Sequence, residues 1–222
     1  PPSVGIHASN LKEFETLLVR NRIFMDRTIN VGAFTADRAL AYGFTGPNLR
    51  ACGVDYDVRV MNPYCSYEEF DFIVPVGQNG DTYDRFMVRQ EEMWQSLRII
   101  EQAIAKLDAM DDKETYFAKD PRFVLPPKEK VYNNMEALIW HFKIVMGETD
   151  IPAGEVYHSI EAANGELGFY LVSDGGRTAS RLHFRRPCFI YYQAYPEMVK
   201  GAMLSDAILT MSSMNVIAGE LD

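Results

Sequence analysis

The strongest constraint on the fold is an apolar pattern with heptad-like spacing in the middle of the chain. Between Thr82 and Leu107, apolar side chains recur at intervals of four and three residues, at Met93, Leu97, Ile100, Ile104 and Leu107. This spacing places them on one stripe of an α-helix, and Asp81 is a suitable N-cap residue. At about 1.5 Å per residue the pattern predicts a helix of about 39 Å, long enough to be the axis of a helical bundle. If that stripe is buried, we expect Ile100→Asp to destabilise the chain severely and Arg98→Ala only mildly.

Further helices are predicted from caps, stops and apolar spacing. They cover about residues 11–21, 35–42, 128–146 and 198–211. Ser9 or Asn10 can cap the first helix, whereas Thr35 caps the second and Gly43 stops it. The stretch 109–127 is rich in charge and proline, which is typical of a long surface connection.

After Pro152 the pattern changes from helices to strands. The segments "EVYHSIEA", "GFYLVSD" and "SRLHFRRP" are separated by Asn164-Gly165 and Gly175-Gly176, which are residues typical of hairpin turns. The predicted fold is therefore α+β and mainly helical, a multihelical bundle with a small antiparallel sheet near the C-terminus. We expect a helical bundle portion at 1–150, a small antiparallel β region at 151–190, and a C-terminal helix with a non-periodic tail at 191–222.

Charge and hydropathy exclude two classes of function. A formal net charge of -9 disfavours nucleic-acid binding, which needs clustered basic residues. The densest basic cluster lies on a predicted strand and is more typical of a solvated or partner-facing edge; it contains Arg177, Arg181, His183, Arg185 and Arg186. No apolar run reaches the roughly 18 residues that a membrane span requires.

Common catalytic and metal-binding motifs are absent from the sequence. There is no GxSxG, phosphate-binding loop, HExxH or GxGxxG motif. The three cysteines, Cys52, Cys65 and Cys188, have no CxxC spacing, so neither a disulfide framework nor a metal site is predicted. The loop "PVGQNGDTYDRF" resembles an anion-binding loop, but we favour an ordinary turn because Asp81 already satisfies the helix N-terminus. No catalytic residue is assigned.

The stretch "GPNLRACGVDYDVR", residues 46–59, combines charge with turn-forming residues. It looks too irregular for a helix and too polar for a core strand. Arg50, Asp55, Asp57 and Arg59 can fix such a loop by internal charge pairing and still present an arginine, Arg50 or Arg59, to a neighbouring protein of a larger assembly. The alternative is a set of ordinary surface ion pairs worth less than about 1 kcal/mol each.

Several ordered stretches carry a resemblance to one known family. They are "NRIFMDRTINVG", "GPNLRACGVDYDVR", "FIVPVGQNGDTYDRFMVRQEEMWQSLRIIEQAI", "GELGFYLVSDGG" and the final "GELD". Together they resemble the 49 kDa type subunit of the proton-pumping NADH:quinone oxidoreductase, respiratory complex I. The resemblance runs from about Phe14 to Asp222 and covers roughly the C-terminal half of that family's chain.

The resemblance also implies a fold and a site. The family is similar to the large subunit of nickel-iron hydrogenases, whose metal is held by cysteine pairs, but the tail at 215–222 contains no sulfur ligand. The resemblance implies instead a former metal site, now without its ligands, that forms a wall of the quinone cavity. The residues implied to line this cavity are Asn215, Val216, Ile217, Gly219, Arg185 and Pro187. An amide at Asn215 beside an apolar Ile217 suits a neutral quinone headgroup, whereas Arg186 replaces a commoner small residue.

The resemblance finally implies partners and a location. Quinone is the substrate, and the terminal iron-sulfur cluster is held by a partner subunit, so this chain alone binds no cofactor. Other subunits attach it to the membrane, at the cytoplasmic face of the bacterial inner membrane, and the isolated chain is expected to be inactive. The alternative function is a non-catalytic assembly or interaction module on the same scaffold. The mass of the natural protein would discriminate between the two.

Overall fold

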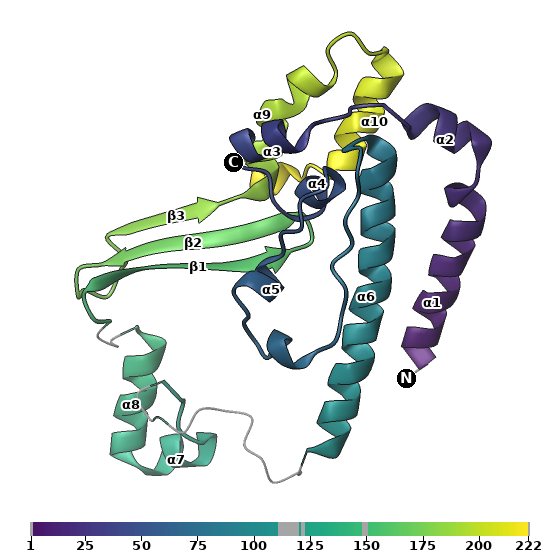
Figure 1. Cartoon of the computed structure of the whole chain (residues 1–222). Coiled ribbons are helices and arrows are strands. Elements are labelled where there is room, and N and C mark those ends of the chain that lie inside the picture. Colours follow the sequence, from purple (N-terminus) through teal and green to yellow (C-terminus); the bar gives the residue numbers. More distant parts are fainter. Residues whose placement is uncertain (1, 111–119, 121–122, 148–150, 222) are drawn as a thin grey trace. The chain divides into compact units, whose positions relative to one another are not determined.

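The computed structural model describes residues 2–110, 120, 123–147 and 151–221 (Figure 1). Internal contacts divide the chain into two compact units, each built from separate stretches of the sequence. The first contains residues 1–108, 159–168 and 185–222, and the second contains residues 109–158 and 169–184. Among the described residues, no helix has both the length and the apolar character needed to cross a bilayer. Most of the expected surface connection at 109–127 lies outside the described residues.

The long helix predicted from the apolar spacing is present as α6 (Thr82–Ala109). Asp81 caps it, because its carboxylate accepts a hydrogen bond from the backbone N–H of Asp84 at 2.8 Å. The backbone N–H groups of Gln78 and Asn79 donate in turn to the Asp84 carboxylate, at 2.9 and 2.6 Å. Because these amides are satisfied within the turn, the interpretation of this loop as an ordinary turn is confirmed.

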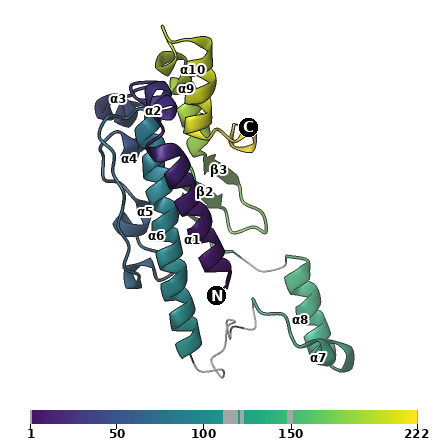
Figure 2. The same ribbon diagram turned by 90° about the vertical axis from the view of Figure 1, so that its right-hand side faces the viewer.

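The N-terminal helix lies beside α6 in both ribbon views (Figure 1, Figure 2). It consists of α1 (Pro2–Phe14) and a π-helical turn, η1 (Glu15–Val19). Nε2 of Gln90 donates to the Leu11 carbonyl at 3.3 Å, and Nε1 of Trp94 donates to the Glu15 carboxylate at 2.6 Å. The expected cap at residue 9 or 10 is wrong, since both residues lie inside α1 and a cap must lie where the helix begins. The next helix, α2, spans Arg22–Thr28.

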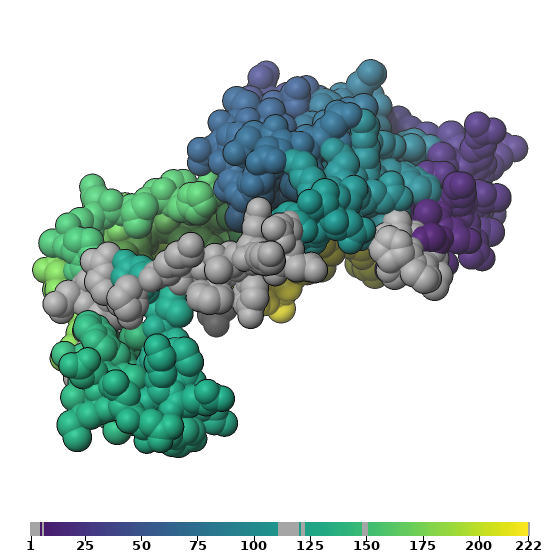
Figure 3. All heavy atoms as spheres, turned by 90° about the horizontal axis from the view of Figure 1, so that it is seen from below, coloured from purple at the N-terminus to yellow at the C-terminus, as the bar shows by residue number. Residues whose placement is uncertain are grey.

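The apolar stripe of α6 is not buried in this chain. Met93, Ile100 and Leu107 keep 43, 45 and 65% of their surface exposed. The buried residues of α6 lie nearer its start and are Thr82, Arg85, Val88, Gln90 and Gln95. In Figure 3, which views the molecule from below, the last turns of α6 (teal) lie at the surface. The expectation of severe destabilisation by Ile100→Asp is therefore wrong for this chain, because the side chain already contacts solvent.

The main apolar core lies among four helices of the first unit. These are α3 (Ala36–Tyr42), α4 (Gly46–Ala51), α9 (Pro187–Met198) and α10 (Leu204–Met214). The buried members of the core are Phe34, Ala39, Phe44, Leu49, Cys52, Tyr191, Ala194, Met198 and Met214. The cap at Thr35 and the stop at Gly43, which has a left-handed backbone, are confirmed.

Three of these helices differ from the sequence prediction. Helix α9 was not predicted, because Pro196 lies inside it and interrupts the helical pattern. Helix α10 begins at Leu204 instead of near Met198, and it extends through Met214. Residues 46–51, expected to be irregular, form α4. A short helix, α5 (Val58–Met61), and two 3-10 turns, η2 (Tyr67–Glu69) and η3 (Ala218–Glu220), complete this unit.

A close contact between two glycines joins α4 to the first hairpin. A Cβ atom on Gly46 would lie 2.3 Å from the Cα of Gly165, and Gly46 has a φ of +60°. A Cβ on Gly165 would in turn lie 2.4 Å from the hydroxyl oxygen of Tyr191. Gly46 therefore requires glycine for the close backbone approach, and Gly165 requires it to leave room for Tyr191.

The predicted sheet is present, and its strands follow one another in the order β1-β2-β3. They span Gly154–Ala162, Gly165–Ser173 and Arg181–Arg185. The α+β, mainly helical fold with a small antiparallel sheet is confirmed. The single helix expected at 128–146 is wrong, however, because the chain forms α7 (Lys128–Asn133) and α8 (Met135–Val145). Asn134 separates the two, since its side chain accepts a hydrogen bond from the backbone N–H of Ala137 and starts a new helix.

Candidate functional site

Residues 215–220, near the end of the first unit, form a short segment that we call the tail arch. Its first residue, Asn215, ends α10 with a left-handed backbone (φ 56°, ψ 49°). The side-chain Nδ2 of Asn215 donates to Oδ1 of Asn164 at 2.5 Å. Asparagine tolerates this backbone conformation better than most residues. The chain can therefore leave the helix sharply at this point.

Glu220 fixes the other end of the tail arch. One of its carboxylate oxygens accepts from the backbone N–H of Cys188 at 3.1 Å, and the other accepts from Nδ2 of Asn164 at 3.4 Å. Cys188 is the second residue of α9, so the carboxylate lies at a helix N-terminus, where negative charge is stabilised. Burial and a hydrogen bond with Glu220 raise the pKa of the Cys188 thiol to about 12.

The middle of the tail arch faces outward. Ile217 is 48% exposed, and Gly219 is also exposed, with no atom within 4 Å of a Cβ placed on it. Val216 is half-buried and packs against the main core. The arrangement is an apolar side chain presented to the exterior on a backbone that is anchored at both ends.

The structure places the other two residues of the implied cavity differently. Pro187 is buried as the first residue of α9, next to the Cys188 amide that binds Glu220. Arg185 donates to the carbonyls of Glu166 and Gly43, at 2.7 and 2.9 Å. These contacts turn the Arg185 guanidinium toward α3 and β2. Pro187 thus belongs with the tail arch, whereas the hydrogen bonds of Arg185 are made elsewhere.

The charged stretch 46–59 contributes to a buried ionic cluster. Nη1 of Arg50 lies 2.9 Å from Oε1 of Glu161, and Nη2 lies 2.6 Å from Oε1 of Glu92. Asp57 lies 3.4 Å from the same guanidinium. Internal charge pairing is thus confirmed for Arg50, Asp57 and Arg59, whereas Asp55 is exposed and takes no part in these pairs. The alternative of surface ion pairs is wrong for this cluster, because Arg50 is only 1% exposed.

The two arginines of this cluster differ in what they offer a neighbour. With 1% exposure, Arg50 has no surface for a subunit contact, so that expectation is wrong for Arg50. Arg59 binds Asp57 at 2.6 Å, and its guanidinium lies 4.9 Å from the ring centre of Phe72. A subunit contact through Arg59 stays a prediction.

The pKa values of the cluster follow from burial opposed by charge. Burial alone would lower the pKa of Arg50, but the charges of Glu92, Glu161 and Asp57 outweigh it and raise that pKa. Burial raises the pKa of Glu161 despite the nearby charge of Arg50. Burial would also raise the pKa of Asp57, but hydrogen bonds from Arg59 and its charge hold that pKa below the usual value.

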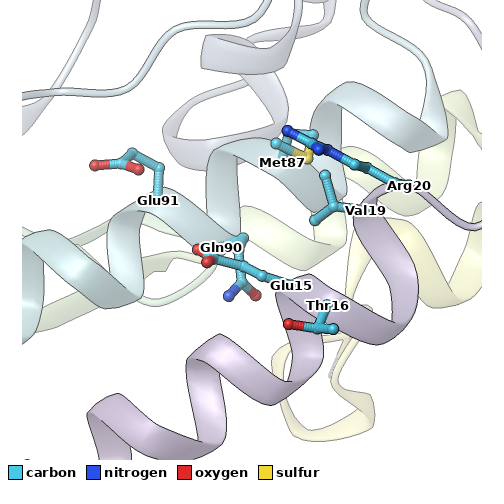
Figure 4. A pocket seen from close by; sticks show the side chains of 7 residues that line it. All are labelled: Glu15, Thr16, Val19, Arg20, Met87, Gln90 and Glu91. Carbon is cyan, nitrogen blue, oxygen red and sulfur yellow. The ribbon is translucent and has the colours of Figure 1, made fainter.

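A cavity of about 470 Å³ lies away from the tail arch, between η1 and α6 (Figure 4). Its lining residues are Glu15, Thr16, Val19, Arg20, Met87, Gln90 and Glu91. None of them is among the residues implied by the resemblance. The candidate site is therefore the tail arch and not this cavity.

Sequence reasoning missed the residues that anchor the tail arch. Local spacing marks Asn164 only as a hairpin residue and Cys188 only as an unpaired cysteine, yet both bind Glu220. The "GELD" ending contains Glu220, so one signal was present in the sequence. No group of three or more histidine, cysteine, aspartate or glutamate residues with metal-binding geometry occurs in the described part of the chain.

Comparison with known proteins decides the family. The model of the family described as "Respiratory-chain NADH dehydrogenase, 49 Kd subunit" matches residues 4–222. The chain belongs to this family. The NADH-quinone oxidoreductase D 2 subunit of Cytophaga hutchinsonii is 72% identical over 212 residues, covering 96% of this chain and 54% of that protein.

More distant members of the family match over the same extent. The NADH-quinone oxidoreductase D subunit of Flavobacterium johnsoniae is 69% identical over 211 residues, which are 95% of this chain and 50% of that protein. Its counterpart in Myxococcus xanthus is 50% identical over 212 residues, again 96% of this chain and 50% of that protein. The chain spans about half the length of the curated relatives it matches.

Proposed function

We propose that this chain forms one wall of the quinone-reduction cavity in a membrane-associated NADH:quinone oxidoreductase. The names of its relatives, NADH-quinone oxidoreductase subunits, support this class of reaction. The observation that carries the proposal is the tail arch, in which Ile217 is 48% exposed between the anchors Asn215 and Glu220. Binding sites for neutral, largely apolar molecules combine such apolar contacts with a few fixed polar groups.

In this proposal the electrons come from an iron-sulfur cluster on a partner subunit. Such clusters are usually held by four cysteine thiolates, and the whole chain has three cysteines. Burial raises the pKa of Cys52 to about 11 and that of Cys188 to about 12, so both remain thiols near neutral pH. The residues of this chain do not fit a cluster. Their part is to bind and orient the quinone headgroup.

The same proposal assigns partners and a location. The chain works with the other subunits of the complex, above all the iron-sulfur subunit that carries the terminal cluster. These subunits attach it to the cytoplasmic face of the bacterial inner membrane, and proton translocation belongs to the whole complex. The chain alone is expected to be inactive, because Ile217 contacts solvent and a cavity needs an opposing wall.

The test is to enlarge Ile217 in the intact complex. Replacement by Phe adds volume to a fitted cavity, which typically costs about 1–3 kcal/mol, or about one to two decades in affinity. Replacement by Met keeps the volume and changes the shape, so its effect should be smaller. We expect weaker binding of quinone-site inhibitors and altered quinone kinetics. Electron transfer from NADH to an artificial acceptor that bypasses quinone should be unchanged. Both activities are measured on membranes at equal assembly levels.

The matched control is Ile217→Val, which keeps the branched shape and adds no volume. Wild-type inhibitor sensitivity and quinone kinetics in both the Met and the Phe variant would remove Ile217 from the cavity. If assembly alone changed in those variants, the chain would instead be a non-catalytic interaction module, the alternative function.

A further inference from the structure

The end of α10 is held by two side chains from distant parts of the chain. Ser213 and Met214 are its last residues, and carbonyl groups at a helix C-terminus have no partner within the helix. Nη1 of Arg89 donates to the Ser213 carbonyl, and Nη2 donates to the Met214 carbonyl at 3.4 Å. Nδ2 of Asn48 donates to the same Met214 carbonyl at 3.3 Å. Helices α4 and α6 thus satisfy the carbonyls from which the tail arch starts.

Arg89 differs from the arginines of the buried ionic cluster in its hydrogen-bond acceptors, as Arg85 on the same helix also does. Arg50 and Arg59 each pair with a carboxylate. Among the described residues, the acceptors of Arg89 are carbonyl and side-chain amide oxygens. Its Nε is buried and lacks a hydrogen-bond partner within this part of the chain. A buried donor without a partner lowers stability, which calls for an explanation.

The position of the Arg89 guanidinium at the C-terminus of α10 supplies this explanation. A helix C-terminus carries partial negative charge, so a cation is stabilised there even without a carboxylate. Nη2 of Arg89 also donates to Oδ1 of Asn48 at 3.3 Å, which orients the Asn48 amide so that its Nδ2 points to Met214. Met214 is fully buried, and the next residue, Asn215, begins the tail arch with a left-handed backbone. The pair therefore holds the helix end from which the arch leaves.

We propose that Arg89 is a positioning residue for quinone reduction, which acts with Asn48 by fixing the end of α10 and hence the orientation of the tail arch. This inference rests on the proposed function of the arch. Arg89 does not contact quinone in this arrangement. Its substitution should therefore change how well quinone and inhibitors bind and leave the turnover of bound quinone nearly intact.

The experiment compares Arg89→Gln and Arg89→Lys in the complete complex on membranes. Losing one such set of hydrogen bonds typically corresponds to about a 2- to 10-fold change in affinity. We expect Arg89→Gln to raise the KM for quinone and the inhibitor concentration for half inhibition by that factor, with kcat within about twofold. Lysine keeps the cation at the helix end and should restore part of the effect. Arg98→Gln is the matched control, since Arg98 lies on the same helix and pairs with Asp71 at the surface.

Two further variants make failure of the inference distinct from failure of the proposed function. If Ile217→Phe shifts KM and inhibitor sensitivity but Arg89→Gln does not, the arch lines the cavity and the positioning role is wrong. If neither variant shifts them, the proposed function itself fails. If Arg89→Gln prevents assembly, Asn48→Ala replaces it, because it removes one donor to the same Met214 carbonyl. A wild-type KM in Asn48→Ala would then overturn the positioning role.

Discussion

The guanidinium of Arg50 and the carboxylate of Glu161 lie 2.9 Å apart, although 111 residues separate them in the sequence. Both side chains are almost fully buried, at 2 and 4% exposure. The contact joins α4 to β1 within the first unit, and Glu92 brings α6 to the same guanidinium. One arginine thus holds three elements together at their polar centre.

Arg50→Met should lower the free energy of unfolding by about 3–5 kcal/mol, because it leaves buried carboxylates without their shared cation. Urea unfolding of the purified chain measures this difference. The control is Arg98→Met, in which an exposed pair with Asp71 is lost and the cost should stay below about 1 kcal/mol. Similar unfolding midpoints for the two variants would mean that the cluster contributes no more than a surface pair.

Asp57→Asn and Glu161→Gln should change the pH dependence of stability in opposite ways. The folded-state pKa of Asp57 lies below 3.8, so its contribution is present above pH 3.8 and is lost as the pH falls through the depressed value. The folded-state pKa of Glu161 lies above 4.5, so its contribution is present below pH 4.5 and is lost as the pH rises through the raised value. Urea unfolding at a series of pH values gives the free energy of unfolding as a function of pH. Below pH 3.8 this free energy should change less with pH in Asp57→Asn than in the wild type. In Glu161→Gln the weaker pH dependence should appear above pH 4.5. The same pH dependence in both variants would refute the opposite pKa shifts of the two carboxyl groups.

Alkylation at pH 8 should modify one of the three cysteines in the folded chain. Cys65 is exposed, whereas Cys52 and Cys188 are buried. Burial also raises their pKa values to about 11 and about 12, and the thiolate is the reactive form. Intact-mass spectrometry after iodoacetamide treatment should show one added group in buffer and three in denaturant. Cys65→Ser should then show none in buffer, and any rapid modification of that variant would place Cys52 or Cys188 at the surface.

Gly46→Ala should destabilise the chain by about 2–4 kcal/mol, from backbone strain at positive φ and overpacking against Gly165. The added Cβ would lie 2.3 Å from the Cα of Gly165, which is backbone and cannot rotate away. Gly219→Ala is the matched control, because open space surrounds that position, and its effect should stay within about 0.5 kcal/mol. Thermal unfolding compares the two variants. A similarly small loss of stability in both variants would show that α4 and the hairpin separate easily.

Local signals in the sequence were sufficient for much of the fold. The apolar spacing and Asp81 predicted α6, Thr35 and Gly43 predicted α3, and two hairpin signals predicted the sheet. Each of these depends on residues within a few positions of one another. The prediction failed at α9, which continues through Pro196, and at α7 and α8, where the capping signal of Asn134 was overlooked.

The environment of the candidate site depends on distant residues and was harder to predict. The resemblance named Asn215 and Ile217, but nothing near them in the sequence shows that Asn164 and Cys188 anchor the arch. Arg50 looked like a surface residue for the same reason, since its partners Glu92 and Glu161 come from other elements. Burial of the α6 stripe was wrongly predicted because apolar spacing shows which face seeks a partner, and this chain does not supply one within the described residues.

The contact between Gly46 and Gly165 has a consequence for how the family can vary. Neither position accepts a methyl group in the present arrangement, because the Cα of Gly165 blocks it at Gly46 and the Tyr191 hydroxyl blocks it at Gly165. A single substitution at either position should therefore give a less stable protein. Only an accompanying change of the surrounding backbone would offset that loss of stability. Across descendants of a common ancestor, both glycines should therefore be retained wherever α4 and the hairpin keep this close approach.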